Sequence, residues 1–158
     1  MRVLDILDVD CANYKKTAMF LITPKCTFKC NKDANCEVCQ NQSLMASPAI
    51  DFPNDKLILR YHANELTHAV VIGGLEPFDT FEDVMSFIDD FRSDNEDDIV
   101  IYTGYKEEEV ADKMALLRSR GYDNIIIKFG RFIPDETSHF DKLLGVNLAS
   151  SNQYAVAV

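Results

Sequence analysis

The sequence contains no uncharged apolar run that approaches the roughly 20 residues a membrane-spanning helix needs. Its first ten residues, Met1 to Asp10, alternate apolar residues with three aspartates, so they lack the basic start and apolar core of a signal peptide. No low-complexity stretch and no internal repeat is present. We therefore expect a cytoplasmic protein that has no membrane partner.

Positive charge is scarce. The chain has 16 Lys and Arg residues against 26 Asp and Glu residues, a formal net charge of -10. A surface of this sign repels phosphate backbones, so nucleic acid is not an expected partner. No Ser, His and Asp arrangement and no phosphate-cradling glycine loop is present, and the three histidines have no ligand spacing.

Length and pattern together predict the fold. With 158 residues and 47% hydrophobic content, the chain can form one domain spanning residues 1–158. Short β-branched runs alternate with amphipathic segments, which indicates parallel strands joined by helices that bury both faces of the sheet. The fold class is α/β, either a small partial (β/α) barrel or an open, mostly parallel sheet with flanking helices.

Individual elements follow from the same pattern. Strands are expected at residues 17–23, 68–72, 98–102 and 124–129. Helices are expected at residues 80–92 and 107–120, and residues 55–65 form either a helix or a strand. Thr80, with Asp83 three residues later, is expected to cap the helix that follows it.

The cysteines carry the clearest chemical signal. Four of the five lie in the string CTFKCNKDANCEVC, as Cys26, Cys30, Cys36 and Cys39. A reducing cytosol keeps thiols free, and closely spaced thiolates bind iron-sulfur clusters or zinc. A structural zinc site would use all four, whereas a cluster that also binds a substrate would use three. Cys11, which is isolated, is expected to be a small core residue.

Several further motifs resemble one known family. CTFKC is followed by CQN at residues 39–41, GGLEPF at 73–78, YTGYKEEE at 102–109, KFGRFIPD at 128–135 and SSNQ at 150–153. In this order they resemble the radical S-adenosylmethionine enzymes, and among these the activating proteins of anaerobic ribonucleoside-triphosphate reductases. The sequence departs from the family's pattern at two places. Eight residues separate Cys30 from Cys39, where the family usually has two. Leu75 separates the glycine pair from Glu76, where the family's acidic residue normally follows the glycines directly.

The resemblance implies two cofactors, a [4Fe-4S] cluster and S-adenosylmethionine. Cys26, Cys30 and Cys39 would hold the cluster, with Cys36 as the alternative third ligand. Residues expected around the S-adenosylmethionine include Glu76, which would accept a hydrogen bond from the ligand's ammonium group. The others are Phe28, Val38, Gly73, Gly74, Tyr102 and Thr103. Each has an ordinary structural alternative, such as core packing for the aromatic residues or a plain turn for the glycines.

The implied activity is that of an enzyme, a glycyl-radical activase. It would cleave S-adenosylmethionine with an electron from a reduced donor protein and take a hydrogen from a glycine of an anaerobic ribonucleoside-triphosphate reductase. Two alternatives stay open. One is a zinc-stabilised α/β binding module, and the other is radical chemistry directed at another peptide. Lys128 and Arg131 would face a carboxylate or the partner protein, or would simply be solvated cations.

Overall fold

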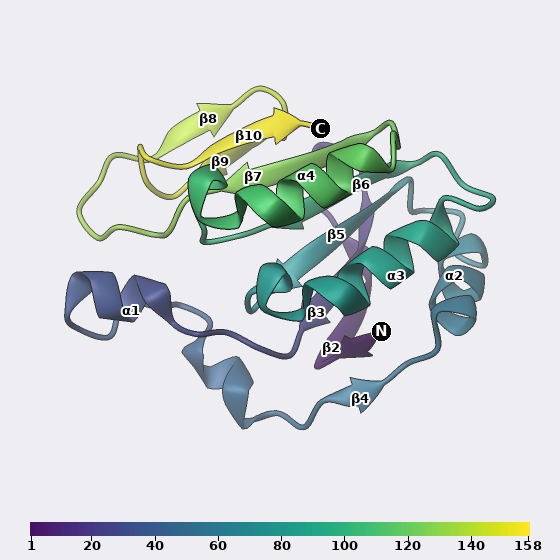
Figure 1. Cartoon of the computed structure of the whole chain (residues 1–158), viewed down its shortest axis with the longest axis horizontal. Coiled ribbons are helices and arrows are strands. Elements are labelled where there is room, and N and C mark those ends of the chain that lie inside the picture. Colours follow the sequence, from purple (N-terminus) through teal and green to yellow (C-terminus); the bar gives the residue numbers. More distant parts are fainter.

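The computed structural model describes all residues, 1–158 (Figure 1). Its core is a six-stranded sheet, and two small two-stranded sheets lie outside it. The strands are β1 (Arg2–Val3), β2 (Asp5–Asp10), β3 (Ala18–Thr23), β4 (Ile50–Asp51), β5 (Ala69–Gly74), β6 (Asp98–Tyr102), β7 (Ile125–Phe129), β8 (His139–Asp141), β9 (Val146–Leu148) and β10 (Tyr154–Ala157). The helices are α1 (Lys29–Ala34), α2 (Asn54–His62), α3 (Phe81–Phe91) and α4 (Ala111–Ser119), with 3-10 turns η1 (Gln42–Ala46), η2 (Pro77–Thr80) and η3 (Glu107–Val110).

The strand order of the large sheet is β10-β7-β6-β5-β3-β2. The four central strands, β3, β5, β6 and β7, are parallel, and both edge strands pair antiparallel with their neighbours. The sheet does not close, so the open-sheet form of the predicted fold is confirmed. Because the central strands are parallel, their carboxyl ends meet at one edge, where ligands of α/β sheets gather.

The two faces of the sheet are covered differently. Helices α2, α3 and α4 pack on one face, where their apolar residues join every second residue of the central strands in one cluster. The opposite face has a smaller cluster that includes Tyr14 and the hairpin residues Leu144 and Leu148. Helices on both faces were predicted, but the β8–β9 hairpin and its flanking loops cover the second face instead. No helix of the structure is long and apolar enough to span a bilayer.

The predicted helices need two corrections. The segment expected to be helical from residue 107 begins as the 3-10 turn η3 and becomes α-helical only at Ala111. Thr80 occupies the N-cap position of α3, but its hydroxyl donates to the carbonyl of Pro77 and makes no capping hydrogen bond. The hydroxyl is used by the 3-10 turn that immediately precedes the helix. The ambiguous segment 55–65 is helical as far as His62, as part of α2.

Two glycines end β5 for different reasons. A Cβ atom on Gly73 would lie 3.2 Å from both the Phe20 ring and the Tyr102 Cβ, so this glycine lets two aromatic side chains approach across the strand. Gly74 has a φ of 84°, and a Cβ there would lie only 2.5 Å from Ile22 Cγ2. A left-handed residue with no free space on its Cβ side admits only glycine.

We predict that Gly74→Ala destabilises the protein more than Gly121→Ala does. Gly121 also has a positive φ, of 65°, but nothing lies within 4 Å of its Cβ position. Gly121→Ala should therefore lower the free energy of unfolding by only the cost of a left-handed alanine, about 1 kcal/mol. Gly74→Ala should lose about 1 to 3 kcal/mol more through overpacking against Ile22. Urea unfolding of the metal-free variants measures both, and equal losses would contradict the proposed steric role.

Candidate functional site

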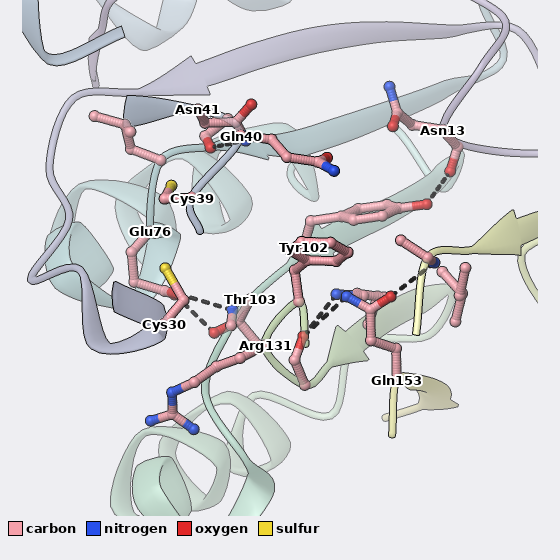
Figure 2. Close-up of a pocket in the computed structure, with 18 of the residues that line it drawn as sticks. Asn13, Cys30, Cys39, Gln40, Asn41, Glu76, Tyr102, Thr103, Arg131 and Gln153 are labelled. Atoms are coloured by element: carbon pink, nitrogen blue, oxygen red, sulfur yellow. Dashed lines mark hydrogen bonds between the residues drawn. The ribbon is translucent and has the colours of Figure 1, made fainter. Parts of the chain in front are cut away.

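A cavity of about 520 Å³ lies at the carboxyl ends of the parallel strands (Figure 2). The loops that follow β3, β5, β6 and β7 all contribute to its wall. These loops supply Cys26, Glu76, Thr103 and Gly130 respectively, each within three residues of the end of its strand. The β8–β9 hairpin forms part of the opposite wall, from Val146 to Ala149.

Three of the four clustered cysteines line this cavity. Cys26, Cys30 and Cys39 do so, whereas Cys36 is exposed and is not part of the wall. Helix α1 carries Cys30 in its first turn, and the chain returns to the cavity at Cys39 after a turn at Asn35. Cys11 is exposed, so its prediction as a core residue was wrong. It lies in the polar connection between β2 and β3, where its thiol is 3.9 Å from the Thr17 hydroxyl.

Glu76 is the one carboxylate among the residues that line the cavity. Its Oε1 accepts hydrogen bonds from the Phe78 amide at 3.0 Å and the Thr103 hydroxyl at 2.7 Å, and its Oε2 accepts one from the Gly104 amide at 2.9 Å. Burial raises the pKa of this carboxyl to about 7, although the three donors favour the charged form. Glu76 therefore joins the loops after β5 and β6.

The other residues predicted around the ligand are placed unequally. Gly74, Tyr102 and Thr103 line the cavity, but Phe28, Val38 and Gly73 do not. Phe28 packs against the small apolar cluster of Leu4, Ile22 and Leu75. Val38 belongs to the cysteine segment, and Gly73 acts indirectly, by leaving room for the side chains of Phe20 and Tyr102, which line the cavity.

Lys128 and Arg131 are both buried, with 7% of each residue exposed, so the solvated alternative is wrong for both. Lys128 Nζ donates to the Gly130 carbonyl at 2.8 Å and has no carboxylate within ion-pair distance. Burial lowers its pKa to about 8, while the charge of Glu76 acts in the opposite direction. Lys128 is therefore mostly protonated at neutral pH, and it is a buried cation without an anionic partner.

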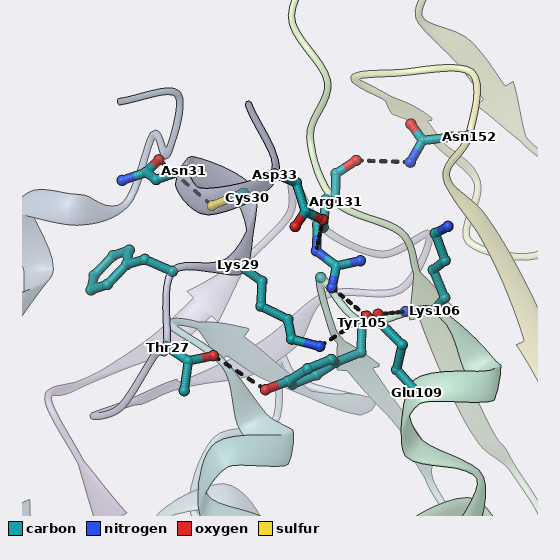
Figure 3. Close-up of polar contacts among 12 residues, drawn as sticks. Thr27, Lys29, Cys30, Asn31, Asp33, Tyr105, Lys106, Glu109, Arg131 and Asn152 are labelled. Atoms are coloured by element: carbon teal, nitrogen blue, oxygen red, sulfur yellow. Dashed lines mark hydrogen bonds and ion pairs between the residues drawn. The ribbon is translucent and has the colours of Figure 1, made fainter. Parts of the chain in front are cut away.

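Arg131 lies instead in an ionic network that holds the cysteine segment (Figure 3). Its Nη2 donates to Glu109 Oε1 at 2.7 Å, and its Nε is 3.1 Å from Asp33 Oδ2 on α1. Lys29, also on α1, donates to the same Glu109 oxygen at 2.9 Å. The hydrogen bond from Arg131 is the main cause that lowers the pKa of Glu109 to about 2.

Tyr105 adds a second attachment for the same segment. Its hydroxyl lies 2.7 Å from Asp79 Oδ1 and 3.2 Å from the Thr27 hydroxyl. Asp79 in turn accepts from the Thr27 amide at 2.7 Å. The segment that carries the cysteines is therefore tied to the loops after β5, β6 and β7 by polar contacts.

Comparison with known proteins identifies the family. The model of the 4Fe-4S single cluster domain matches residues 16–153, which is most of the chain. This protein belongs to that family. No curated protein and no solved structure matches the chain. The protein therefore contains an iron-sulfur cluster-binding domain, which favours the cluster over the zinc-stabilised module as the explanation of its cysteines.

The donor set of this iron-sulfur domain fits a cluster. Three soft thiol ligands share one cavity, and thiolates are the usual ligands of [4Fe-4S] clusters. In the present conformation no three Cys, His, Asp or Glu side chains are arranged to hold a metal ion, so the thiols must draw closer when they bind one. Burial raises the pKa of Cys26 to about 12, and burial followed by the neighbouring Cys39 raises that of Cys30. Cluster binding must therefore displace thiol protons.

Sequence reasoning missed several residues that build this site. The Gln153 carboxamide oxygen accepts from the Ala149 and Ser150 amides, and its Nε2 donates to the Gly130 carbonyl at 3.3 Å. The SSNQ motif thus fixes the hairpin against the loop after β7. The backbone carbonyl of Asn13 accepts a hydrogen bond from the Tyr102 hydroxyl at 2.5 Å. SSNQ was noticed as a motif, but nothing in the pattern around Asn13 indicated its position.

We predict that Arg131→Met loosens the cysteine segment while the sheet stays folded. Loss of the guanidinium removes the ion pair with Asp33 on α1 as well as the charge-assisted hydrogen bond to Glu109, so tryptic cleavage after the exposed Lys32 should become about tenfold faster. Arg118→Met is the matched control, because Arg118 forms a similar pair with Glu107 on the exposed side of α4. Mass spectrometry of the digests measures both rates. The same acceleration in both variants would remove the special role of Arg131.

Proposed function

We propose that this protein is a radical S-adenosylmethionine activase that generates a glycyl radical on an anaerobic ribonucleoside-triphosphate reductase. Cys26, Cys30 and Cys39 would hold the [4Fe-4S] cluster, and S-adenosylmethionine would occupy the rest of the cavity. When bound and reduced by a donor protein, the cluster would supply the electron that breaks a carbon–sulfur bond of S-adenosylmethionine. The resulting 5'-deoxyadenosyl radical would take a hydrogen atom from the target glycine.

One observation carries the proposal. Every motif that resembles the radical S-adenosylmethionine enzymes contributes to the wall of the same cavity, although the motifs span residues 26–153. The contributions come from the cysteine segment, the loops after three parallel strands and the SSNQ segment. Motifs with unrelated roles would not be expected to line one cavity. Their convergence supports a common ligand.

Lys128 suits a ligand that carries a carboxylate. It is the buried cation of the cavity that lacks an anionic partner, and S-adenosylmethionine has a carboxylate group. A charge-assisted hydrogen bond between them would be strong because both groups would be shielded from water. The Glu76 carboxylate already accepts three hydrogen bonds from within the protein, which leaves it little capacity to accept one from a ligand. Its main contribution would be to hold the loops around the ligand.

The exposure of the cysteine segment supports a protein substrate. No residue from 24 to 50 is buried, even though three thiols of this segment face the cavity. A short-lived carbon radical needs a site that excludes water and fixes the distance to its target. A partner that covers this segment would provide both, so we propose that the target glycine is on another protein.

The proposed activity predicts that three components are needed together. After anaerobic loading with iron and sulfide, the protein should give a glycyl doublet in paramagnetic resonance only with a reductant, S-adenosylmethionine and the reductase. The isolated protein should release 5'-deoxyadenosine slowly, because no hydrogen donor is held in place. Air should abolish the doublet. Fast turnover on a small molecule without the reductase would indicate a different radical enzyme, and a colourless zinc protein would exclude radical chemistry.

We predict that Lys128→Met weakens S-adenosylmethionine binding but does not weaken the fold. Loss of one charge-assisted hydrogen bond should cost about 1.5 to 3 kcal/mol of binding free energy, measured by calorimetry on the loaded protein. Removal of an unpaired buried cation should leave the metal-free protein equally or more stable. Lys142→Met, a change at an exposed lysine, should alter neither the binding free energy nor the stability of the metal-free protein.

The pKa of Lys128 adds a pH dependence to the same comparison. Because the folded protein releases this proton near pH 8 and the unfolded chain only near 10.5, unfolded chains bind more protons between these values. The free energy of unfolding should therefore gain from this group as the pH rises from about 8 to 10.5. Lys128→Met should lack this gain. Identical pH profiles in the two proteins would show that Lys128 is not buried as a cation.

A further inference from the structure

One side chain holds the end of the insertion between the second and third cavity cysteines. Cys30 and Cys39 are separated by eight residues, and this stretch includes most of α1 and a left-handed turn at Asn35, with a φ of 53°. Cys36 lies inside the insertion and is exposed, whereas Cys39 lines the cavity. Something must therefore return the chain to the cavity at Cys39 and not three residues earlier.

Asn31, directly after Cys30, makes the contacts that do this. Its Oδ1 accepts hydrogen bonds from the Val38 amide and the Cys39 amide, both at 2.9 Å. The Cys30 thiol lies 3.8 Å from the same oxygen, a contact drawn in Figure 3. One carboxamide oxygen thus links the residue that carries the second thiol to the backbone of the third.

The other groups of Asn31 fix the rest of the insertion. Its backbone carbonyl accepts from the Cys36 amide at 3.2 Å, and its Nδ2 donates to Gln42 Oε1 at 2.6 Å. Gln42 Nε2 donates onward to Glu37 at 2.9 Å. Only a side chain that both accepts and donates can make this set of contacts, and asparagine has both groups on a short stem.

The contact at Cys36 has the opposite effect from the contact at Cys39. The amide of Cys36 is bound to the backbone of α1, where it forms part of the turn that ends the helix, so its side chain stays on the outer side of the insertion. Beyond Cys39, the Asn41 carboxamide donates to the Gly74 carbonyl at 2.7 Å. Cys39 is therefore held between Asn31 on one side and the end of β5 on the other.

We propose that Asn31 is a positioning residue that selects Cys39 over Cys36 as the third thiol of the site. The cluster-ligand part of this inference rests on the proposed function. The positioning itself is a property of the metal-free chain, because all of its contacts are within the protein. It follows that the choice between two nearby cysteines is made before any metal binds.

The first test uses the metal-free, reduced protein and a thiol-alkylating reagent. In the unchanged protein, Cys36 should react faster than Cys39. In Asn31→Leu, which keeps the size but no polar atoms, the rate at Cys39 should rise about tenfold or more, as expected when two hydrogen bonds are lost from a local opening. Asn31→Asp keeps an acceptor for the Val38 and Cys39 amides and loses only the donor to Gln42, so its rate at Cys39 should stay much closer to that of the unchanged protein than the rate in Asn31→Leu does. Lys32→Ala, an exposed neighbour on α1, is the control.

The second test measures iron retained against a chelator after anaerobic loading. With Asn31 present, Cys39→Ala should lose its iron and Cys36→Ala should keep it. Asn31→Leu alone should weaken retention about 10- to 100-fold, the range typical of residues that orient metal ligands without touching the metal. When Asn31→Leu is combined with each cysteine variant, the difference in iron retention between Cys39→Ala and Cys36→Ala should become smaller, because Cys36 can then compete with Cys39 as the third ligand.

The two tests separate the possible failures. An unchanged alkylation rate at Cys39 in Asn31→Leu would overturn the positioning role, whatever the iron content. A changed alkylation rate in a protein that never binds iron would uphold the positioning role and refute the proposed cluster function. Retention that depends on Cys36 with Asn31 intact would reverse the proposed selection. Thermal unfolding of each variant checks that the sheet is unaffected, which is expected because no residue of the insertion is buried.

Discussion

The buried carboxylate of Glu76 connects more of this site than any other group. Its oxygens bind the loops after β5 and β6, and its backbone amide donates to the Lys25 carbonyl at 2.7 Å, next to the first cavity cysteine. Three segments that are distant in sequence thus meet at one residue. Burial of a carboxylate is unfavourable unless its lone pairs are satisfied, and here backbone amides and a hydroxyl satisfy them. The geometry of the cavity depends on this balance.

The sheet and the cysteine segment are stabilised by different forces. The sheet has a large apolar cluster between its strands and α2, α3 and α4, whereas the segment from 24 to 50 has no buried residue. Ion pairs and hydrogen bonds to Arg131 and Tyr105 hold the segment in place, together with the packing of the partly buried Phe28 against a small apolar cluster. Exposed ionic contacts are individually weak and are screened by salt. The part of the protein that carries the thiols is thus attached mainly by polar contacts.

The sequence indicated the sheet well because its central strands are continuous apolar runs. Residues 98–102 form β6 over their whole length, and the runs at 17–23 and 68–72 match β3 and β5 to within one or two residues. The antiparallel edge strands and the β8–β9 hairpin were not predicted, since their residues are partly exposed and lack a strong apolar pattern. Helices were expected on both faces because parallel strands are usually covered that way, and here the hairpin replaces one layer.

Parts of the site could be predicted where a residue type has one dominant chemistry. The parts whose burial or orientation depends on tertiary contacts could not. Clustered thiols indicated a metal site, and three of them line the cavity. The burial of Lys128 and Arg131 could not be predicted, because long charged side chains near a strand end are usually solvated. Asn31 gave no signal at all, since its role depends on a turn that brings Val38 and Cys39 back to it.

The weak attachment of the cysteine segment has a consequence for how the protein is assembled. Because no residue from 24 to 50 belongs to the large apolar cluster of the sheet, the chain can reach its folded state as a metal-free protein and acquire iron and sulfide afterwards. Opening of the segment would then cost only its local contacts and not the whole folding free energy.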